Sequence, residues 1–217
     1  MVGYKNIIWD WNGTIVNDAW VFVEIMNKIL QQEGLPPTTL KHYRQNFCFP
    51  IQDYWRGLGF QFTDESFNKL NKQFIFEYQN KMFLPTLHDK MLTFLKKTKK
   101  QKIQQFVLSA SEQGLLDKSI AYYNLKGFFN GVYGVNNLNA YGKEDLGVSL
   151  CKKHKLYIKD TVLIGDTEYD KDVAKKIGCD VILMSHGHIN HQRLLKTKKR
   201  VVASVKQLGF LLGSFNQ

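Results

Sequence analysis

Apolar residues recur along this chain with two different spacings, and their order predicts an α/β protein. Short apolar runs typical of buried strands cover residues 6–9, 104–109, 131–135, 161–165, 180–184 and 201–202. Apolar residues three or four positions apart predict helices over 89–100, 112–124, 143–154, 169–177 and 205–212. Strands that alternate with helices after Pro85 favour parallel pairing through crossover helices. The pattern therefore predicts a doubly wound parallel sheet.

The segment between the first strand and Pro85 has only the helical spacing. It predicts four helices, over 20–32, 39–47, 51–58 and 64–81. We therefore expect an α/β core domain made of residues 1–15 and 83–217, with an all-helical cap domain of residues 16–82 inserted into it. An insertion that leaves the sheet at the carboxyl end of a strand lies over the crevice where such folds bind ligands.

Composition narrows the class of protein further. The chain has 217 residues, 44% of them hydrophobic, which is typical of a globular protein. Thirty Lys and Arg against nineteen Asp and Glu give a net charge of +11. The lysine-rich stretches 96–102 and 196–200 have no interleaved aromatic residues, so they favour a solvated surface over nucleic-acid binding. The charge also suits an anionic small substrate.

The remaining features of the composition predict a cytoplasmic protein. No apolar run reaches the roughly 18 residues of a membrane span, so we expect no membrane partner. Three cysteines, far apart and without a C-x-x-C pair, indicate neither a disulfide framework nor a structural zinc site. The oligomeric state is not fixed by the sequence.

Polar residues stand where several of the predicted strands end. They are Asp10, Asn12, Ser109, Asp166 and Asp170, and Lys143 begins the helix before the fourth strand. Because the carboxyl ends of parallel strands share one edge of a sheet, we expect these side chains to converge. Three close carboxylates resist burial unless a cation joins them. Oxygen ligands of this kind favour Mg²⁺.

The sequence resembles the haloacid dehalogenase-like hydrolase superfamily, in its helical-cap, phosphoglycolate phosphatase-like subclass. The motifs that carry the resemblance are Asp10-x-Asn-Gly-Thr14, Ser109, Lys143 and Gly165-Asp166-x-x-x-Asp170. The resemblance implies a Rossmann-like core and a Mg²⁺-dependent phosphatase that acts on a small phosphorylated metabolite.

The resemblance also implies a role for each motif residue. Asp10 would be the nucleophile that forms an aspartyl-phosphate, and Ser109 and Lys143 would contact the phosphoryl group. Mg²⁺ would be held by the side chains of Asp10 and Asp166 and by the backbone carbonyl of Asn12. Asp170 would complete the metal site by orienting water and Lys143.

Asn12 departs from the family pattern, in which phosphatases usually carry Asp at that position as general acid and base. An amide does neither, and such assistance is worth about 10²- to 10⁴-fold in rate. Three interpretations follow. The protein is a phosphatase for a good leaving group or one that recruits Asp18, Glu112 or a cap residue as acid; or it is a phosphonate or haloacid-type hydrolase; or it is a catalytically impaired phosphate-binding module.

Two further groups of residues are candidates for substrate contact. His186, His188 and His191 follow the strand over 180–184, and one of them could touch the substrate or supply the acid. A metal site at His186-x-His188 is less favoured than polar surface. Arg44 and Arg56 are the only arginines of the cap, and either could bind a second anionic group, although a surface role is the simpler interpretation.

Overall fold

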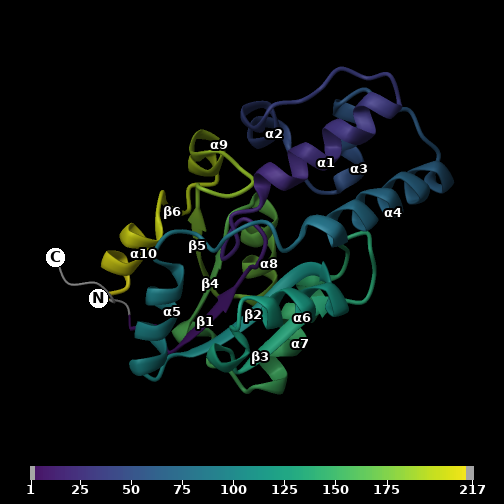
Figure 1. The fold of residues 1–217 in the computed structure, drawn as a ribbon. Helices are drawn as coiled ribbons and strands as arrows, with labels where there is room; N and C mark the ends of the chain where they lie inside the picture. Colours follow the sequence, from purple (N-terminus) through teal and green to yellow (C-terminus); the bar gives the residue numbers. More distant parts are fainter. Residues whose placement is uncertain (1–2, 214–217) are drawn as a thin grey trace.

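A computed structural model describes residues 3–213, which form a six-stranded sheet flanked by helices (Figure 1). The strands are β1 (Asn6–Trp9), β2 (Gln104–Glu112), β3 (Gly131–Val135), β4 (Thr161–Gly165), β5 (Asp180–Met184) and β6 (Arg200–Val202). Their order is β3-β2-β1-β4-β5-β6, and every neighbouring pair is parallel. The predicted doubly wound parallel sheet is confirmed.

Helices cover both faces of this sheet. They are α5 (Met91–Lys100), α6 (Gln113–Tyr122), α7 (Lys143–Lys153), α8 (Glu168–Ile177), α9 (His191–Lys196) and α10 (Val205–Leu211), with short 3₁₀ turns η1 (Lys126–Phe128) and η2 (Ile158–Asp160). Successive residues of β1 point to opposite faces of the sheet and pack against different helices. Ile7 and Trp9 pack with residues of α5, α6 and α10, whereas Ile8 packs with residues of α7 and α8. All four β1 residues are buried, which explains the apolar run of Ile7, Ile8 and Trp9, and the buried Asn6 amide donates to the Thr161 hydroxyl.

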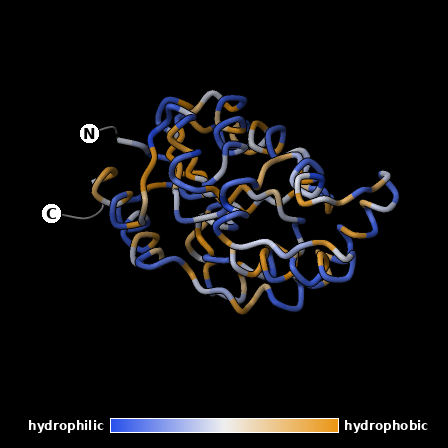
Figure 2. The backbone as a smooth tube through the Cα atoms, turned by 90° about the horizontal axis from the view of Figure 1, so that it is seen from above, coloured by the Kyte–Doolittle hydropathy of each residue, from blue (hydrophilic) through white to orange (hydrophobic). Residues whose placement is uncertain are grey.

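Four more helices lie between β1 and α5. They are α1 (Ala19–Gln32), α2 (Leu40–Asn46), α3 (Ile51–Gly57) and α4 (Asp64–Lys81), and we call them the cap helices. In Figure 1 they lie together at one end of the sheet. Each of the two longer ones, α1 and α4, buries one face and exposes the other. Figure 2 shows the resulting alternation of hydrophobic and hydrophilic residues along the backbone as a whole. The division into two separate domains stays a prediction.

Two segments differ from the elements that the sequence predicts. Strand β2 does not end at Ser109 but continues to Glu112, with a shift in register against β3 between Leu108 and Glu112. Helix α9 lies where a loop was expected. It is only six residues long and buries only Leu194, so it leaves almost no periodic signal.

Strand β1 is the point at which the winding of the sheet reverses, because β2 lies on one side of it and β4 on the other. Ligands of open parallel sheets bind outside the carboxyl ends of the strands at such a point. The residues after β1 and β4 are therefore the first place to look for chemistry. No helix among residues 3–213 is both long and apolar enough to cross a membrane.

Candidate active site

Asp10 and Lys143 meet at the carboxyl end of β1. The Nζ atom of Lys143 lies 2.5 Å from Oδ1 of Asp10 and 2.6 Å from Oδ1 of Asp170. Lys143 is the first residue of α7, directly after Gly142, whose φ of 88° suits glycine. Burial opposes the charge on Lys143, but attraction to Asp10 and Asp170 outweighs it and raises the pKa of the ammonium. Lys143 is therefore a fixed cation at the edge of the sheet.

Asp10, Asp166 and Asp170 form a compact group of buried carboxylates. Each has an oxygen within 4.8 Å of the others. Three carboxylates face one ammonium, so the group would have two excess negative charges if all three were ionised. Burial is the main cause that raises the pKa of Asp10 to about 6 and that of Asp166 to about 8. The group fits a divalent cation, because such an ion would balance both charges and accept carboxylate oxygens as ligands.

Asp170 is held by the first turn of its own helix. Its Oδ2 accepts hydrogen bonds from the backbone N–H groups of Asp166 and Thr167 and from the Thr167 hydroxyl. Thr167 in turn caps α8 by accepting the N–H of Asp170. Gly165 is required beneath this turn, since a Cβ there would lie 2.2 Å from the carboxyl carbon of Asp170. Asp170 is thus placed to orient Lys143.

Asp166 is fixed by two loops that approach it closely. Its Oδ1 accepts the Thr14 hydroxyl at 3.0 Å, and its Oδ2 accepts the backbone N–H of His188 at 2.5 Å. A Cβ on Gly13 or on Gly187 would lie within 2.4 Å of Asp166 Oδ2, so both positions need glycine. These contacts hold Asp166 beside Asp10.

Asn12 is held by three partners. Its Nδ2 donates to Oδ2 of Asp18 at 2.5 Å and to the hydroxyl of Tyr78 at 2.6 Å. Its Oδ1 accepts the hydroxyl of Ser111 at 2.7 Å. Asp18 also accepts the backbone N–H of Gly13 at 2.8 Å and is fully buried. The structure thus places a carboxylate next to the amide at position 12.

Ser109 lies beside this group on β2. It is buried, and its Oγ accepts the backbone N–H of Ser111 at 3.1 Å. Its hydroxyl proton is therefore free to point towards a bound anion. All six motif residues that the sequence singled out lie at one cavity: Asp10, Asn12, Ser109, Lys143, Asp166 and Asp170.

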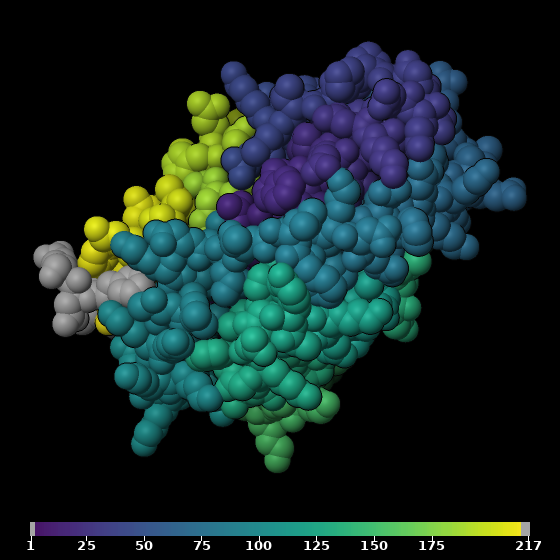
Figure 3. All heavy atoms as spheres, in the orientation of Figure 1, coloured from purple at the N-terminus to yellow at the C-terminus, as the bar shows by residue number. Residues whose placement is uncertain are grey.

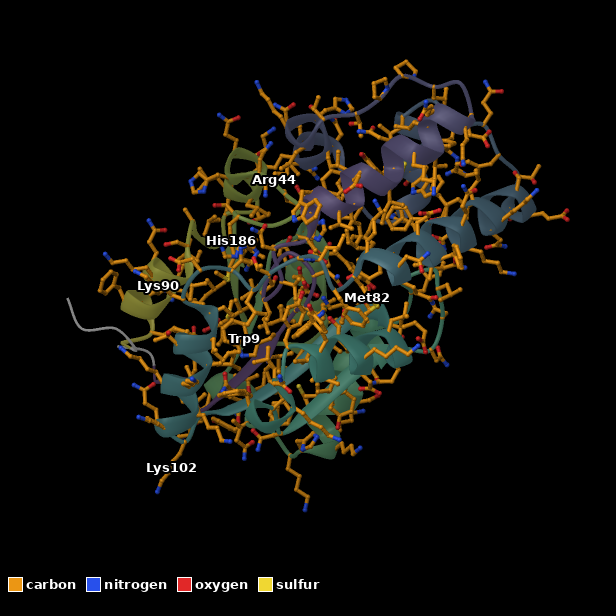
Figure 4. The ribbon with its side chains drawn as sticks, viewed as in Figure 1. Trp9, Arg44, Met82, Lys90, Lys102 and His186 are labelled. Atoms are coloured by element: carbon orange, nitrogen blue, oxygen red, sulfur yellow. The ribbon has the colours of Figure 1, made fainter. Side chains whose placement is uncertain are left out.

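The cavity has a volume of about 140 Å³ and lies between the sheet edge and the cap helices. Two arginines join the cap to the core. Arg44 of α2 donates to the backbone carbonyls of Gly187 and His186 at 2.7 and 2.9 Å, and Figure 4 labels Arg44 and His186 on this side. Arg193 of α9 donates to the carbonyl of Phe47 at 2.7 Å. In Figure 3 the cap surface accordingly lies against the yellow-green segment around α9.

The candidate general acids are placed very differently. Asp18 contacts Asn12 but does not line the cavity, and Glu112 lines it but caps α6 by accepting the N–H of Leu115. His188 lines the cavity, whereas His186 and His191 do not. No feature of the sequence distinguishes His188 from the other two histidines.

Neither arginine of the cap lines the cavity. Arg44 donates to backbone carbonyls, and Arg56 pairs with Asp53 at the surface.

His188 is buried between the cap and the carboxylates. Its Nδ1 forms a 2.7 Å hydrogen bond with the hydroxyl of Tyr43, and its Nε2 lies 3.4 Å from Oδ1 of Asp18. Burial opposes a proton on the ring, but attraction to Asp18 and Asp166 outweighs it and raises the pKa of His188. His188 is therefore hydrogen bonded to the cap through Nδ1, while its Nε2 lies near Asp18 without a hydrogen bond to any residue that the structure describes.

A pair of stacked histidines lies under the turn after β1. The rings of His88 and His186 stack face to face, with centroids 3.6 Å apart, and Nε2 of His88 hydrogen bonds to the Gly13 carbonyl at 3.0 Å. Burial is the main cause that lowers the pKa of His88 to about 4 and that of His186 to about 3. The face-to-face stacking does not point the ring nitrogens at one metal ion.

This pair predicts acid sensitivity. Both histidines are neutral when folded and take up protons near pH 6.5 when unfolded, so stability is lost as pH falls from about 6.5 towards 4. We expect the free energy of unfolding to fall by up to about 1.4 kcal/mol per pH unit for each histidine. Urea unfolding between pH 4.5 and 7.5 measures this slope. His186→Phe should remove about half of the slope that the two histidines contribute. His191→Phe, at an exposed residue away from the pair, should leave the slope unchanged. An unchanged slope in His186→Phe would contradict the assignment.

The fold and the site together define a class: a doubly wound α/β protein with three carboxylates and a lysine at the switch point, under a set of helices. The family model described as haloacid dehalogenase-like hydrolase matches residues 7–184. This chain therefore belongs to the haloacid dehalogenase-like hydrolases, as the motifs predicted. A comparison with curated protein sequences finds no match.

Solved structures with the same fold include several bacterial proteins. A predicted phosphatase from Clostridium acetobutylicum has a TM-score of 0.83 and 17% identity, over 98% of this chain and 99% of that one. A haloacid dehalogenase-like family protein from Streptococcus pneumoniae has a TM-score of 0.81 and 17% identity, over 97% of this chain and 100% of that one. A predicted phosphoglycolate phosphatase from Haemophilus somnus has a TM-score of 0.77 and 19% identity, over 97% of this chain and 99% of that one. At these identities the likeness shows the shared fold.

Proposed function

We propose that this protein is a Mg²⁺-dependent phosphatase that hydrolyses a small phosphate monoester through an aspartyl-phosphate on Asp10. The observation that carries the proposal is the buried cluster of Asp10, Asp166 and Asp170 with Lys143 bound between two of its members. The names of several structural neighbours, which describe phosphatases, support the same reaction class.

The residues of the site divide the work of such a reaction. A carboxylate oxygen of Asp10 attacks phosphorus while the bond from phosphorus to the leaving oxygen breaks. Lys143 and the Ser109 hydroxyl stabilise the charge on the phosphoryl oxygens. Water then attacks the phosphorus of the acyl phosphate, which releases inorganic phosphate and restores the Asp10 carboxylate. The departing oxide takes its proton from water.

The metal would be held by Asp10 and Asp166, with the Asn12 backbone carbonyl as a third ligand and Asp170 supporting the site. When bound, Mg²⁺ would neutralise charge on the phosphoryl group. The cap helices would shield the cavity from bulk water, and the arginine contacts of α2 and α9 hold the cap against the core.

Phosphate release is the first test of this proposal. We expect Mg²⁺-dependent release from small monoesters that is abolished by EDTA and restored by added Mg²⁺. We also expect Mg²⁺ to stabilise the protein, by about 2.7 kcal/mol at 100 times its dissociation constant. Thermal unfolding with and without Mg²⁺ measures this effect.

Asp166→Asn should remove the stabilisation by Mg²⁺, because it deletes a charged ligand. Asp172→Asn is the matched control, since Asp172 lies on α8, the helix that follows Asp166, but is exposed and pairs only with Lys171 among the ion pairs of the described residues. Stabilisation by Mg²⁺ that survives Asp166→Asn would place the metal elsewhere. Phosphate release that persists in EDTA would contradict the Mg²⁺ dependence, whereas release of halide from a haloacid without any phosphate release would support the haloacid-type alternative.

A further inference from the structure

The part of the cavity lining that the cap helices contribute is mostly aromatic and apolar. Helix α4 lines it with Phe74, Ile75 and Tyr78 at helical spacing. Asn71, one turn earlier, also lines the cavity, but its amide already donates to Leu138 and Asn139. Phe22 of α1 also lines the cavity and packs against Phe74 and Tyr78, with ring centroids 5.4 and 5.3 Å apart. This wall is where the part of the substrate beyond the phosphoryl group must lie.

The cavity offers no spare positive charge for that part of the substrate. Among the described residues that line it, only Lys143 and His188 can be cationic. Lys143 is held between two carboxylates, and His188 has one nitrogen on Tyr43 and the other facing Asp18. A carboxylate on the leaving group would therefore be buried without a cation of its own, which is unfavourable even where a hydroxyl such as that of Tyr54 is within the cavity.

The size of the cavity restricts the leaving group as well. A volume of about 140 Å³ is close to that of an engineered apolar protein cavity, of about 150 Å³, that binds benzene. The phosphoryl group occupies the end next to Asp10 and Lys143. The enclosed space therefore favours a leaving group no larger than a single ring.

Position 12 adds an independent chemical restriction. The Asn12 amide cannot protonate the departing oxygen, and its Nδ2 is already bound to Asp18 and Tyr78. A leaving group that departs readily as an anion needs no such proton. An aryl oxide meets this condition and also matches the aromatic wall.

We propose that the substrate of this site is an aryl phosphate monoester whose leaving group is one uncharged ring, bound against Phe22, Phe74 and Ile75. This inference rests on the proposed phosphatase function and specifies its substrate class. It disfavours phosphoglycolate, because the carboxylate of that molecule would face the apolar wall.

The test compares two esters that differ in one charge, phenyl phosphate and 4-carboxyphenyl phosphate. The added carboxylate does not make the phenoxide a poorer leaving group, so a slower reaction must come from binding. We expect kcat/KM for phenyl phosphate to be about 100-fold higher. Equal rates, or a preference for the carboxylated ester, would overturn the proposal.

A variant tests the location of the ring. Ile75→Lys places a cation in the wall and is expected to reduce the preference for phenyl phosphate at least about tenfold. Phe76→Lys is the matched control, because Phe76 is next along α4 but is 62% exposed and does not line the cavity. The preference should be unchanged in that variant, and an equal loss in both would remove the ring from this wall.

Binding without turnover separates this inference from the proposed function. Calorimetry with phenylphosphonate and 4-carboxyphenylphosphonate should show the same preference for the uncharged ring. If neither ester is hydrolysed but phenylphosphonate still binds more tightly, the phosphatase function fails and the ring site stands. If hydrolysis occurs but the two phosphonates bind equally, or neither binds, the ring site fails.

Discussion

Asp10→Asn is expected to lower kcat/KM for phosphate monoesters by at least about 10⁴-fold, because it removes the proposed nucleophile. Asp10 Oδ1 lies 2.5 Å from Nζ of Lys143, and the side chain is almost fully buried. An amide of the same shape keeps the packing but cannot form the acyl phosphate. Initial rates of phosphate release, measured with saturating Mg²⁺, test this expectation.

The same variant should not unfold the protein. Losing one of three mutually repelling carboxylates relieves like-charge repulsion, and Lys143 keeps its contact with Asp170. Thermal unfolding without metal should therefore show a midpoint at or above that of the wild type. Asp172→Asn again serves as control and should keep its rate within about twofold. Full activity in Asp10→Asn would exclude Asp10 as the nucleophile.

Most of the fold was predictable, because its elements are defined by burial. The first, fourth and fifth strands read as apolar runs, and every residue of β1 and β4 is buried as a parallel sheet with two covered faces requires. The failures have physical causes. Helix α9 is too short for periodicity, and the polar end of β2 has no apolar pattern because it runs past the site.

The convergence of the motif residues was predictable for a similar reason. Strand ends of a parallel sheet share an edge, so Asp10 and Asp166 had to be neighbours once the topology was known. Contacts between the cap and the core were not predictable. How Tyr78 reaches Asn12, or Arg44 reaches Gly187, depends on how the inserted helices dock, and no local spacing encodes that docking.

The roles of the site residues and the metal stay proposals, and the sequence alternatives differ in what they require. A haloacid-type hydrolase that works without a metal has no need of three buried carboxylates around one lysine. A phosphate-binding module would keep the cluster but would bind phenylphosphonate without hydrolysing phenyl phosphate. The contact between Asn12 and Asp18 bears on the phosphatase interpretation, because it places a carboxylate beside the position where the family's acid is missing.

Exchanging the two side chains, in the double variant Asn12→Asp with Asp18→Asn, is expected to restore general acid catalysis. The present amide and carboxylate are 2.5 Å apart, and the exchange keeps one of each. The new amide at position 18 would still accept the Gly13 N–H through its oxygen and would donate to the new carboxylate. Turnover of cyclohexyl phosphate, whose alkoxide needs a proton, should rise about 10²-fold, while phenyl phosphate changes much less.

The single variant Asn12→Asp introduces the acid without changing Asp18, so it shows how much the acid depends on the residue beside it. It brings two carboxylates into contact beside a fully buried Asp18, so we expect it to be less stable than the double variant. A double-mutant cycle on the free energy of unfolding should give a coupling of at least about 1 kcal/mol that favours the exchanged pair. Urea unfolding of the wild type, both single variants and the double variant measures it. The double variant could be stable and show the expected coupling, yet gain no turnover on cyclohexyl phosphate. That result would mean that the departing oxygen already receives its proton from another residue. His188, which lines the cavity, would then be the first residue to substitute.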